Sequence, residues 1–470
     1  MTESRSYAYY EYLDNIADRL SYGENQPERK AFYKLLAEAC QQRGHDLKSL
    51  DELANIFEDK LKPAKDCPDE EFPYLGLDGI EPNTGRATFT KMLGKDVVSV
   101  SKRFYRGNIV FADLRPYLNK VHLVQIETGI GSGELFTIKP KEELVISGYL
   151  LRYLLSNLTL AQTKWILTGC SFPRLNSEDF RHLKVVCPDK VKQKQVLDRI
   201  EPLEAEVQQK RKDINQLIDN CRNLILKKLN IKMPSPAIFL PTIYDFYLDW
   251  VERNAERLDF VFHHPWMDEI RKLLASIKTV SLGELIEPQI EYGITESGRE
   301  IGNTPFINIG NLCLDGRLRT KDIGYIDYEE DSKLVHQGDI LMSRSRLVGI
   351  SSLVSEKEDG YSFGSYILRL RVKKEIGVPS VYIVNFLNSD LGQGQVRMLE
   401  SGAFGKNINT KQVKAIRIPL TQPDEIDNIV NEIRQTWDKL DEQDKEEETI
   451  ENRAREEFAK MLLGIGSFWS

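Results

Sequence analysis

The chain has 470 residues, a hydrophobic content of 41%, a charged content of 29% and a formal net charge of −8. This length accommodates two to four domains, and this composition is typical of a soluble globular protein, which excludes a fibrous or wholly disordered chain. No apolar run approaches the ~20 residues that a membrane-spanning helix needs. The polar N-terminal segment does not resemble a signal peptide, and the 6 cysteines form no CxxC pair. We therefore expect a cytoplasmic protein with reduced thiols.

Negative charge is concentrated at the C-terminal end of the chain. Residues 423–470 hold 6 Lys and Arg against 14 Asp and Glu, whereas residues 72–190 hold 16 against 11. Because the first β-rich region is locally basic, the acidic balance of the whole chain does not exclude a nucleic-acid partner.

Residues 1–48 form a predicted N-terminal helical region, with helices around Tyr9–Leu20 and Pro27–Arg43. We interpret this region as a packing or partner-docking element. Residues 49–190 then alternate short β-rich runs with Gly and Pro turns and include one clear helix at Ser147–Leu160. This pattern predicts a globular domain of mixed α/β class.

Residues 191–232 predict a central long helix. Its apolar residues are Val196, Ile200, Leu203, Val207, Ile214, Leu217, Cys221 and Leu224. Their steps of four and three give the 3.5-residue period of a helix that packs along another helix. At 1.5 Å per residue the helix would be roughly 60 Å long, which suggests a spacer. Pro202 lies inside it and predicts a kink or a restart.

Residues 233–280 predict a proline-rich linker followed by helices near Tyr244–Arg257 and Trp266–Ile277. Residues 281–422 resume the β-rich pattern as a second globular domain. Residues 423–470 predict a second long helix, whose middle at Asp441–Glu448 lacks apolar residues. The two long helices could form an antiparallel, coiled-coil-like pair, although two amphipathic helices packed on their own domains would carry similar stripes.

The second domain repeats the first at a shift of about 232 residues. KSLDEL at Lys48 aligns with VSLGEL at Val280, YRGNIVFADLRPYLNK at Tyr105 with HQGDILMSRSRLVG at His336, and TGCSFPRLNSEDF at Thr168 with SGAFGKNINTKQV at Ser401. The order of domain, helix, domain and helix indicates an internal duplication and favours a pseudo-twofold arrangement. Two similar domains held apart by a long helix suit a double-stranded DNA target, because half-sites on DNA are separated by one helical turn, ~34 Å.

These repeated segments resemble the DNA specificity subunit, HsdS, of type I restriction-modification systems. GNIVFADLRPYLNK at Gly107, GDILMSRSRLVG at Gly338 and TGCSFPRLNSEDFRHLKVVCPDKVKQKQVLDRI at Thr168 carry the resemblance, together with RLDFVFHHPWMDEIRKLL at Arg257. It covers roughly residues 49–463. The chain departs from the family pattern in its long N-terminal region and in lacking an RLD-like segment before the first copy.

The resemblance implies that residues 49–190 and 281–422 are target-recognition domains, each reading one half of a bipartite DNA site. The helices at 191–232 and 423–470 would set the spacing and dock methyltransferase subunits, of which two are expected. The subunit itself would be non-catalytic and would act in phage defence. S-adenosylmethionine, ATP and Mg²⁺ would bind to the methyltransferase and restriction/translocase partners, so we expect no cofactor, metal or catalytic residue in this chain.

Two alternatives remain at this stage. A duplicated protein-interaction scaffold derived from the same family would keep the architecture without sequence-specific DNA reading. A self-contained methyltransferase is disfavoured, because the chain has no consecutive prolines for an amino-methyltransferase motif. The glycine run at Gly129–Gly133 imitates a cofactor-binding loop but precedes a β-like segment rather than a helix.

The candidate DNA contacts lie mainly in loops that follow aligned strands. Arg can donate two hydrogen bonds to guanine, Asn pairs with adenine, and Lys or Ser reaches phosphates. The candidates in the first domain are Arg103, Arg106, Arg115, Tyr117, Asn119, Lys120, Lys164 and Arg174, and those in the second are Ser343, Arg344, Ser345, Arg346, Lys406, Asn407 and Lys411. A surface ion pair is the ordinary alternative role for each arginine.

Overall fold

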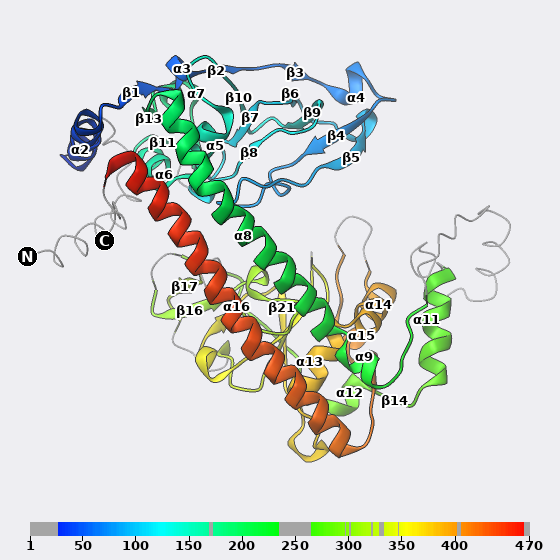
Figure 1. Ribbon diagram of the computed structural model, residues 1–470. Helices are drawn as coiled ribbons and strands as arrows, with labels where there is room; N and C mark the ends of the chain where they lie inside the picture. The colour runs from blue at the N-terminus through cyan, green and yellow to red at the C-terminus, as the bar shows by residue number, and fades with distance from the viewer. Residues whose placement is uncertain are drawn as a thin grey trace, which may run out of the picture. The chain divides into compact units, whose positions relative to one another are not determined.

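The computed structural model describes residues 27–168, 173–234 and 265–464, except 297, 300–301, 321–322, 329–332, 346 and 402–405. The chain divides into two compact units: Met1–Gln208 with Glu448–Ser470 is unit 1, and Gln209–Glu447 is unit 2. Figure 1 shows that each unit combines a β-rich domain with segments of two long helices, α8 (Lys190–Arg222) and α16 (Pro423–Leu463). The helices predicted at 9–20 and 244–257 lie outside the described residues.

The described part of unit 1 opens with α2 and continues into the first β-rich domain. Its other helices are α2 (Pro27–Arg43), α3 (Leu50–Leu53), α4 (Pro63–Asp66), α5 (Ser147–Leu155), α6 (Asn157–Lys164) and α7 (Ser177–Arg181). Its strands are β1 (Asp46–Ser49), β2 (Ala54–Phe57), β3 (Lys60–Leu61), β4 (Glu71–Leu75), β5 (Thr90–Leu93), β6 (Ser101–Tyr105), β7 (Ile109–Ala112), β8 (Val121–Leu123), β9 (Thr128–Ser132), β10 (Leu135–Pro140), β11 (Leu167–Thr168), β12 (Arg174–Leu175) and β13 (Lys184–Cys187).

The central sheet of unit 1, with strand order β2-β10-β7-β8, is covered on both faces. Alternate residues of a strand point to opposite faces. Ile109 and Phe111 of β7 accordingly join the helical core, which includes α5 and parts of α8 and α16. Val110 and Ala112 pack instead against the second sheet, whose order is β3-β6-β9-β4-β5. The run IVFA is therefore apolar throughout because both of its faces are buried.

Unit 2 contains the second β-rich domain. Its other helices are α9 (Leu224–Lys228), α11 (Pro265–Ser276), α12 (Leu282–Leu285), α13 (Ser380–Asn388), α14 (Asp390–Leu399) and α15 (Thr410–Lys414). Its strands are β14 (Thr279–Ser281), β15 (Glu291–Tyr292), β16 (Thr304–Ile307), β17 (Gly324–Ile326), β18 (Ile340–Ser343), β19 (Ser351–Leu353), β20 (Ser362–Phe363), β21 (Ile367–Leu370) and β22 (Arg417–Pro419).

The central sheet of unit 2 has the equivalent order β15-β21-β18-β19 and the same two-faced burial. Ile340 and Met342 of β18 face the helical core, whereas Leu341 packs into the smaller core on the other side. The alternation seen in β7 therefore recurs in β18. Both units are of mixed α/β class, as predicted.

The duplication extends to individual buried hydrogen bonds. Tyr149 on α5 donates its hydroxyl to Val186 O at 2.6 Å, and Tyr382 on α13 donates to Pro419 O at 2.9 Å. The short helices α3 and α12 each begin with a capping box, formed by Ser49 with Glu52 and by its counterpart Ser281 with Glu284. Equivalent residues thus form the same hydrogen bonds and helix caps in both units.

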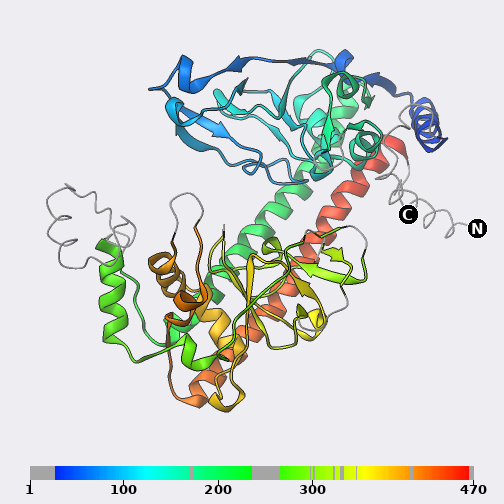
Figure 2. The same cartoon turned by 180° about the vertical axis from the view of Figure 1, so that it is seen from behind.

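The long helices contact each other inside each unit (Figures 1 and 2). In unit 1, Arg199 Nε lies 3.2 Å from Glu457 Oε2. In unit 2, Lys210 Nζ lies 2.6 Å from Glu446 Oε2, and Lys228 on α9 lies 2.5 Å from Glu432. In unit 2, residue numbers increase from Lys210 to Lys228 while those of their partners decrease from Glu446 to Glu432. The paired segments are therefore antiparallel.

The central helix does not restart at Pro202, and it ends earlier than predicted. It passes through Pro202 without ending, on a face where Pro202 and Asp198 are both exposed. It ends at Arg222 rather than near Lys232, because the Asn223 amide hydrogen-bonds Asp390 of α14 at 3.0 Å. After α9, Asn230 takes a positive φ of 53° and Ile231 N bonds to Leu226 O at 2.8 Å, which is a Schellman-type helix stop.

Candidate nucleic-acid interface

The first candidate surface is the turn that follows β7 in unit 1. Arg115 has φ 51° and precedes a short 3-10 turn, Pro116–Leu118, while Asn119 has φ 46°. Proline fixes the backbone at the start of this turn, and asparagine tolerates the left-handed conformation at its end. The turn therefore exposes Arg115 and Tyr117, and Tyr117 is 49% exposed.

A second segment lies directly beside this turn. Arg115 N donates to Pro173 O at 2.8 Å, and Leu175 N donates to Asp113 O at 3.0 Å. These bonds bring β12 alongside the turn, so that Arg174 joins Arg115 although 59 positions separate them in the chain. The structure thus brings together Arg115, Tyr117 and Arg174 from the predicted set.

Two predicted contacts in this turn support the loop instead. Asn119 is fully buried, and its side-chain amide donates to Leu155 O at 2.8 Å. Lys120 donates from Nζ to Leu77 O at 2.6 Å, and burial lowers its pKa. The prediction that Asn119 lies on the exposed reading surface is therefore wrong, because its side chain is buried and bonded to a backbone carbonyl. Lys120 is only partly buried, so its contact with DNA stays a prediction.

The remaining candidates of unit 1 lie on other elements than the turn of Arg115. Arg106 precedes β7, at the opposite end of that strand, and pairs with Glu127 at 2.7 Å. Arg103 lies on β6, where its backbone N bonds to Asp59 O at 2.8 Å. Lys164 is exposed at the end of α6, a helix that contacts the Pro116–Leu118 turn.

A pair of carboxylates lies behind Arg174. Its guanidinium is 2.9 Å from Glu134 Oε1. Burial, and next the charge of Glu134, raise the pKa of Asp113 to about 6. The turn is thus basic at its exposed tip and holds a carboxyl that changes charge in a mildly acidic range.

The equivalent surface of unit 2 follows β18. Arg344 N donates to Tyr366 O at 2.9 Å, and its guanidinium carbon lies 4.9 Å from the centre of the Tyr292 ring. Ser345 forms a β-bridge with Asn407, and Ile408 N donates to Arg344 O at 3.0 Å. As in unit 1, the loop after the central strand pairs with a segment from just before the last short helix.

The other candidates of unit 2 differ in exposure. Ser343 is fully buried, accepting from Ile350 N at 3.0 Å, and Ser345 is only 8% exposed. The predicted placement of these two serines on the exposed surface is therefore wrong, because both side chains are buried within the loop. Lys406 and Lys411 are exposed, and Lys406 lies 2.5 Å from Glu400. Arg346 lies outside the described residues.

Sequence reasoning missed the aromatic neighbours of Arg344. Tyr366 is 59% exposed, Leu347 is 59% exposed and Tyr292 is 37% exposed. An exposed tyrosine beside an arginine is a common element of nucleic-acid surfaces, because the ring can stack and the guanidinium can bond. Only the fold brings Tyr292, from β15, next to β21 and under the guanidinium of Arg344.

Within the described ranges, neither a metal-ligand cluster nor a membrane-spanning helix occurs. No three His, Cys, Asp or Glu side chains there are grouped so that they could hold a metal ion. No helix of the described part is both long enough and apolar enough to cross a membrane. The glycine run at 129–133 forms most of strand β9 and its following turn.

Comparison with known proteins gives a match for the first part of the chain. Residues 43–220 match the model of the type I restriction modification DNA specificity domain. The type I restriction enzyme EcoDI specificity subunit of Escherichia coli is 29% identical over 178 residues, which cover 37% of this chain and 38% of that protein. The HindI specificity subunit of Haemophilus influenzae is 26% identical over 156 residues, covering 31% and 34%. The matched parts thus span less than two fifths of these relatives.

One of the similar solved structures is the HsdS subunit from Thermoanaerobacter tengcongensis. It is 19% identical, with a TM-score of 0.37, and the alignment covers 90% of this chain and 97% of that chain. The resemblance stated from the sequence to type I specificity subunits is therefore confirmed.

Proposed function

We propose that this chain is the DNA sequence-specificity subunit of a type I restriction-modification complex. Each β-rich domain would read one half of a bipartite double-stranded DNA site. The observation that carries the proposal is the specificity-domain match over residues 43–220, combined with the recurrence of the same two-segment loop surface in unit 2. The reading surfaces would centre on Arg115 with Arg174 and on Arg344 with Asn407.

The long helices would act as the spacer between the two reading surfaces. In this proposal α8 and α16 form an antiparallel, coiled-coil-like pair, and the two domains are related by a pseudo-twofold axis. The equivalent sheet orders and the ion pairs of Arg199 and Lys210 with α16 support it. The helices would also dock the methyltransferase subunits, of which we expect two.

The chemistry would belong to partner subunits in the cytoplasm. Adenine methylation from S-adenosylmethionine, and ATP- and Mg²⁺-dependent translocation and cleavage, would be carried by methyltransferase and restriction subunits. This chain would contribute binding without catalysis, which fits a surface made of arginine, tyrosine and asparagine side chains rather than of nucleophiles and bases.

The test uses the complex purified with its methyltransferase partners. A double reverse-charge variant, Arg115→Glu with Arg344→Glu, should lose specific binding, since each good bidentate base contact contributes about 1–3 kcal/mol. Binding would be measured at several salt concentrations on methylated genomic fragments and on random DNA. Lys34→Glu, an exposed change on α2, is the matched control and should bind as the wild type does.

Two outcomes would contradict the proposal. One is equal affinity of the wild-type complex for random and genomic DNA. The other is a double variant that keeps both the specific affinity and the salt dependence of the wild type. Each lost phosphate contact should reduce the slope of log binding constant against log salt concentration by about 0.9.

A further inference from the structure

Two Gly-Arg turns occupy equivalent positions in the two units. Gly85-Arg86 lies in unit 1 and Gly316-Arg317 lies 231 positions later in unit 2. Both glycines have a positive φ, 74° and 93°, which favours glycine. The turns recur in position, residue type and backbone conformation, although neither lies on the candidate reading surfaces.

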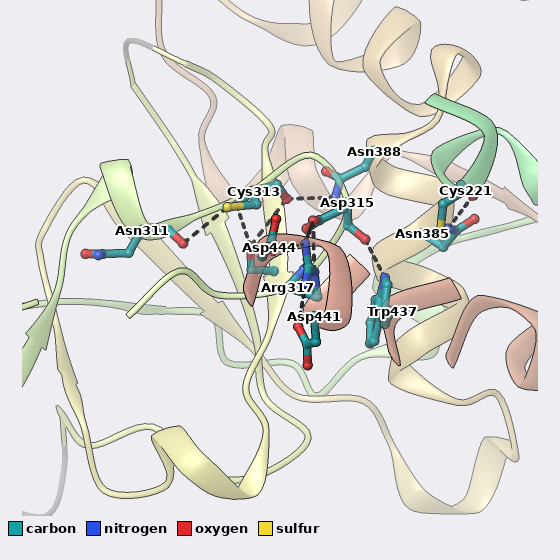
Figure 3. Close-up of polar contacts among 11 residues, drawn as sticks. Cys221, Asn311, Cys313, Asp315, Arg317, Asn385, Asn388, Trp437, Asp441 and Asp444 are labelled. Carbon is teal, nitrogen blue, oxygen red and sulfur yellow. Dashed lines mark hydrogen bonds and ion pairs between the residues drawn. The ribbon is translucent and has the colours of Figure 1, made fainter. Parts of the chain in front are cut away.

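In unit 2 the turn binds α16 through an ion network that is buried on the side of the turn and partly exposed on the side of α16, drawn in Figure 3. The Arg317 guanidinium reaches Asp315 at 2.7 Å within its own turn, and Asp441 at 2.5 Å and Asp444 at 2.9 Å on α16. The Arg317 side chain is 16% exposed and that of Asp315 only 3%. Three carboxylates converge on one planar donor, a geometry that an arginine can satisfy and a lysine cannot.

The backbone of the turn also fits closely against the helix. Trp437 on α16 donates its indole N–H to Asp315 O at 2.7 Å. A Cβ on Gly316 would meet Val384 at 2.8 Å and Trp437 at 2.9 Å. Side-chain charge and backbone shape therefore hold the same eight-residue region of α16, from Trp437 to Asp444, against the domain that precedes it.

In unit 1 the equivalent arginine makes a weaker contact with α8. Arg86 Nη1 donates to Gln208 Oε1 at 3.0 Å, and its nearest carboxylate, Glu81 at 2.5 Å, belongs to its own loop. Gln208 and Asp441 are equivalent positions, 233 residues apart. The Arg86 side chain is also more exposed than that of Arg317, at 35%. Its partner on α8 is a neutral amide in a more solvent-accessible position.

We propose that the Gly-Arg turns are positioning elements that fix each recognition domain on the long helix that follows it, firmly at Arg317 and loosely at Arg86. Arg317 would thereby hold the second reading surface at a set place along α16. The consequence for DNA rests on the proposed function: the firm contact would make the complex intolerant of altered spacing between half-sites.

The first arm of the test needs no DNA. Amide hydrogen exchange of the full chain, in complex with its partners, is compared for the wild type, Arg317→Gln and the matched control Arg86→Gln. Loss of a charge-assisted contact should speed exchange of residues 312–318 at least about tenfold in Arg317→Gln, with no change there in Arg86→Gln. Unchanged exchange at 312–318 in Arg317→Gln, or equal effects of the two variants, would overturn the proposal.

A second variant guards against misfolding. Asp441→Asn removes a half-exposed carboxylate from α16 and leaves Arg317 in place. It should give a smaller increase in exchange at the same segment. Arg317→Lys should not restore protection, because its single ammonium cannot reach all three carboxylates.

The second arm measures binding to sites whose half-site spacing is lengthened or shortened by one base pair. The wild type should prefer its native spacing, and Arg317→Gln should lose about tenfold of that preference while each half-site still contributes. Faster exchange with an unchanged spacing preference would contradict the positioning role. Absence of sequence-specific binding by the wild type would contradict the proposed function instead, and the exchange arm alone would then decide whether Arg317 anchors the domain.

Discussion

Two buried glutamines hold equivalent strands of the two units. Gln162 accepts from Lys184 N at 2.8 Å and donates to Lys184 O at 2.9 Å, and Gln395 does the same with Arg417 at 2.7 and 2.9 Å. Each glutamine bonds to both the backbone N–H and the backbone C=O of one residue. Its removal lowers the stability of the fold, because both backbone groups are then buried without a partner.

We expect Gln395→Leu and Gln162→Leu each to lower the free energy of unfolding by about 1–3 kcal/mol. The exposed change Gln337→Leu serves as the control and should have almost no effect. Thermal unfolding followed by circular dichroism measures the change. Equal midpoints for the buried and exposed variants would show that these bonds do not stabilise the fold.

Asp113 predicts a pH dependence of stability in unit 1. Its pKa is raised to about 6, chiefly by burial, whereas an unfolded chain would give about 3.9. Because the folded state favours the protonated form, the contribution of Asp113 to stability should fall as pH rises from about 4 to about 6. Asp113→Asn should therefore gain stability relative to the wild type across this window. Parallel pH profiles in denaturant unfolding would contradict this assignment.

The sequence predicted part of the candidate surface because the duplication aligned its loops. Arg115 and Arg344 were proposed from these loops, Arg174 and Asn407 were further candidates, and the fold brings the segments of the four residues together in pairs. Asn119 and Ser343 were proposed for the same reason but are buried, since which polar side chain turns inward depends on the local turn. Partners from distant strands, such as Tyr292, leave no local sequence signal.

At the scale of elements, α8 shows how packing overrides a local rule. Pro202 removes one backbone donor, yet the helix continues because Leu203 and Val207 are buried in the same stretch. The exposed carbonyl side at Asp198 can be hydrated instead. The helix end near Asn223 was missed because its cause, a bond to Asp390, comes from a residue 167 positions later in the chain.

Pro202→Ala should stabilise α8. Alanine restores the missing backbone donor, which stabilises the helix by up to ~3 kcal/mol. It also makes the unfolded chain more flexible, which offsets part of this effect, so the free energy of unfolding should rise by about 1–2 kcal/mol. The exposed change Glu206→Ala is the matched control. A lower unfolding midpoint for Pro202→Ala would indicate that the helix depends on a bend at this residue.

At the scale of the molecule, the duplication was the most informative feature of the sequence. Apolar strands and capping residues recur at one shift because both cores need them, so the class and the two-copy organisation could be predicted. The Gly-Arg turns also recur at this shift but were overlooked, since a single glycine and arginine are common in loops. Their proposed role depends on the contacts of Arg317 with the carboxylates of α16, which only the fold brings together.

The central claim is that one chain carries two DNA-reading surfaces held at a fixed separation. Selection of bound sequences from a random DNA library, using the complex with its methyltransferase partners, tests this most directly. We predict two short conserved blocks separated by a non-conserved spacer of constant length, with Arg115→Glu weakening one block and Arg344→Glu the other. A single conserved block, a spacer of variable length, or no enrichment would contradict the account.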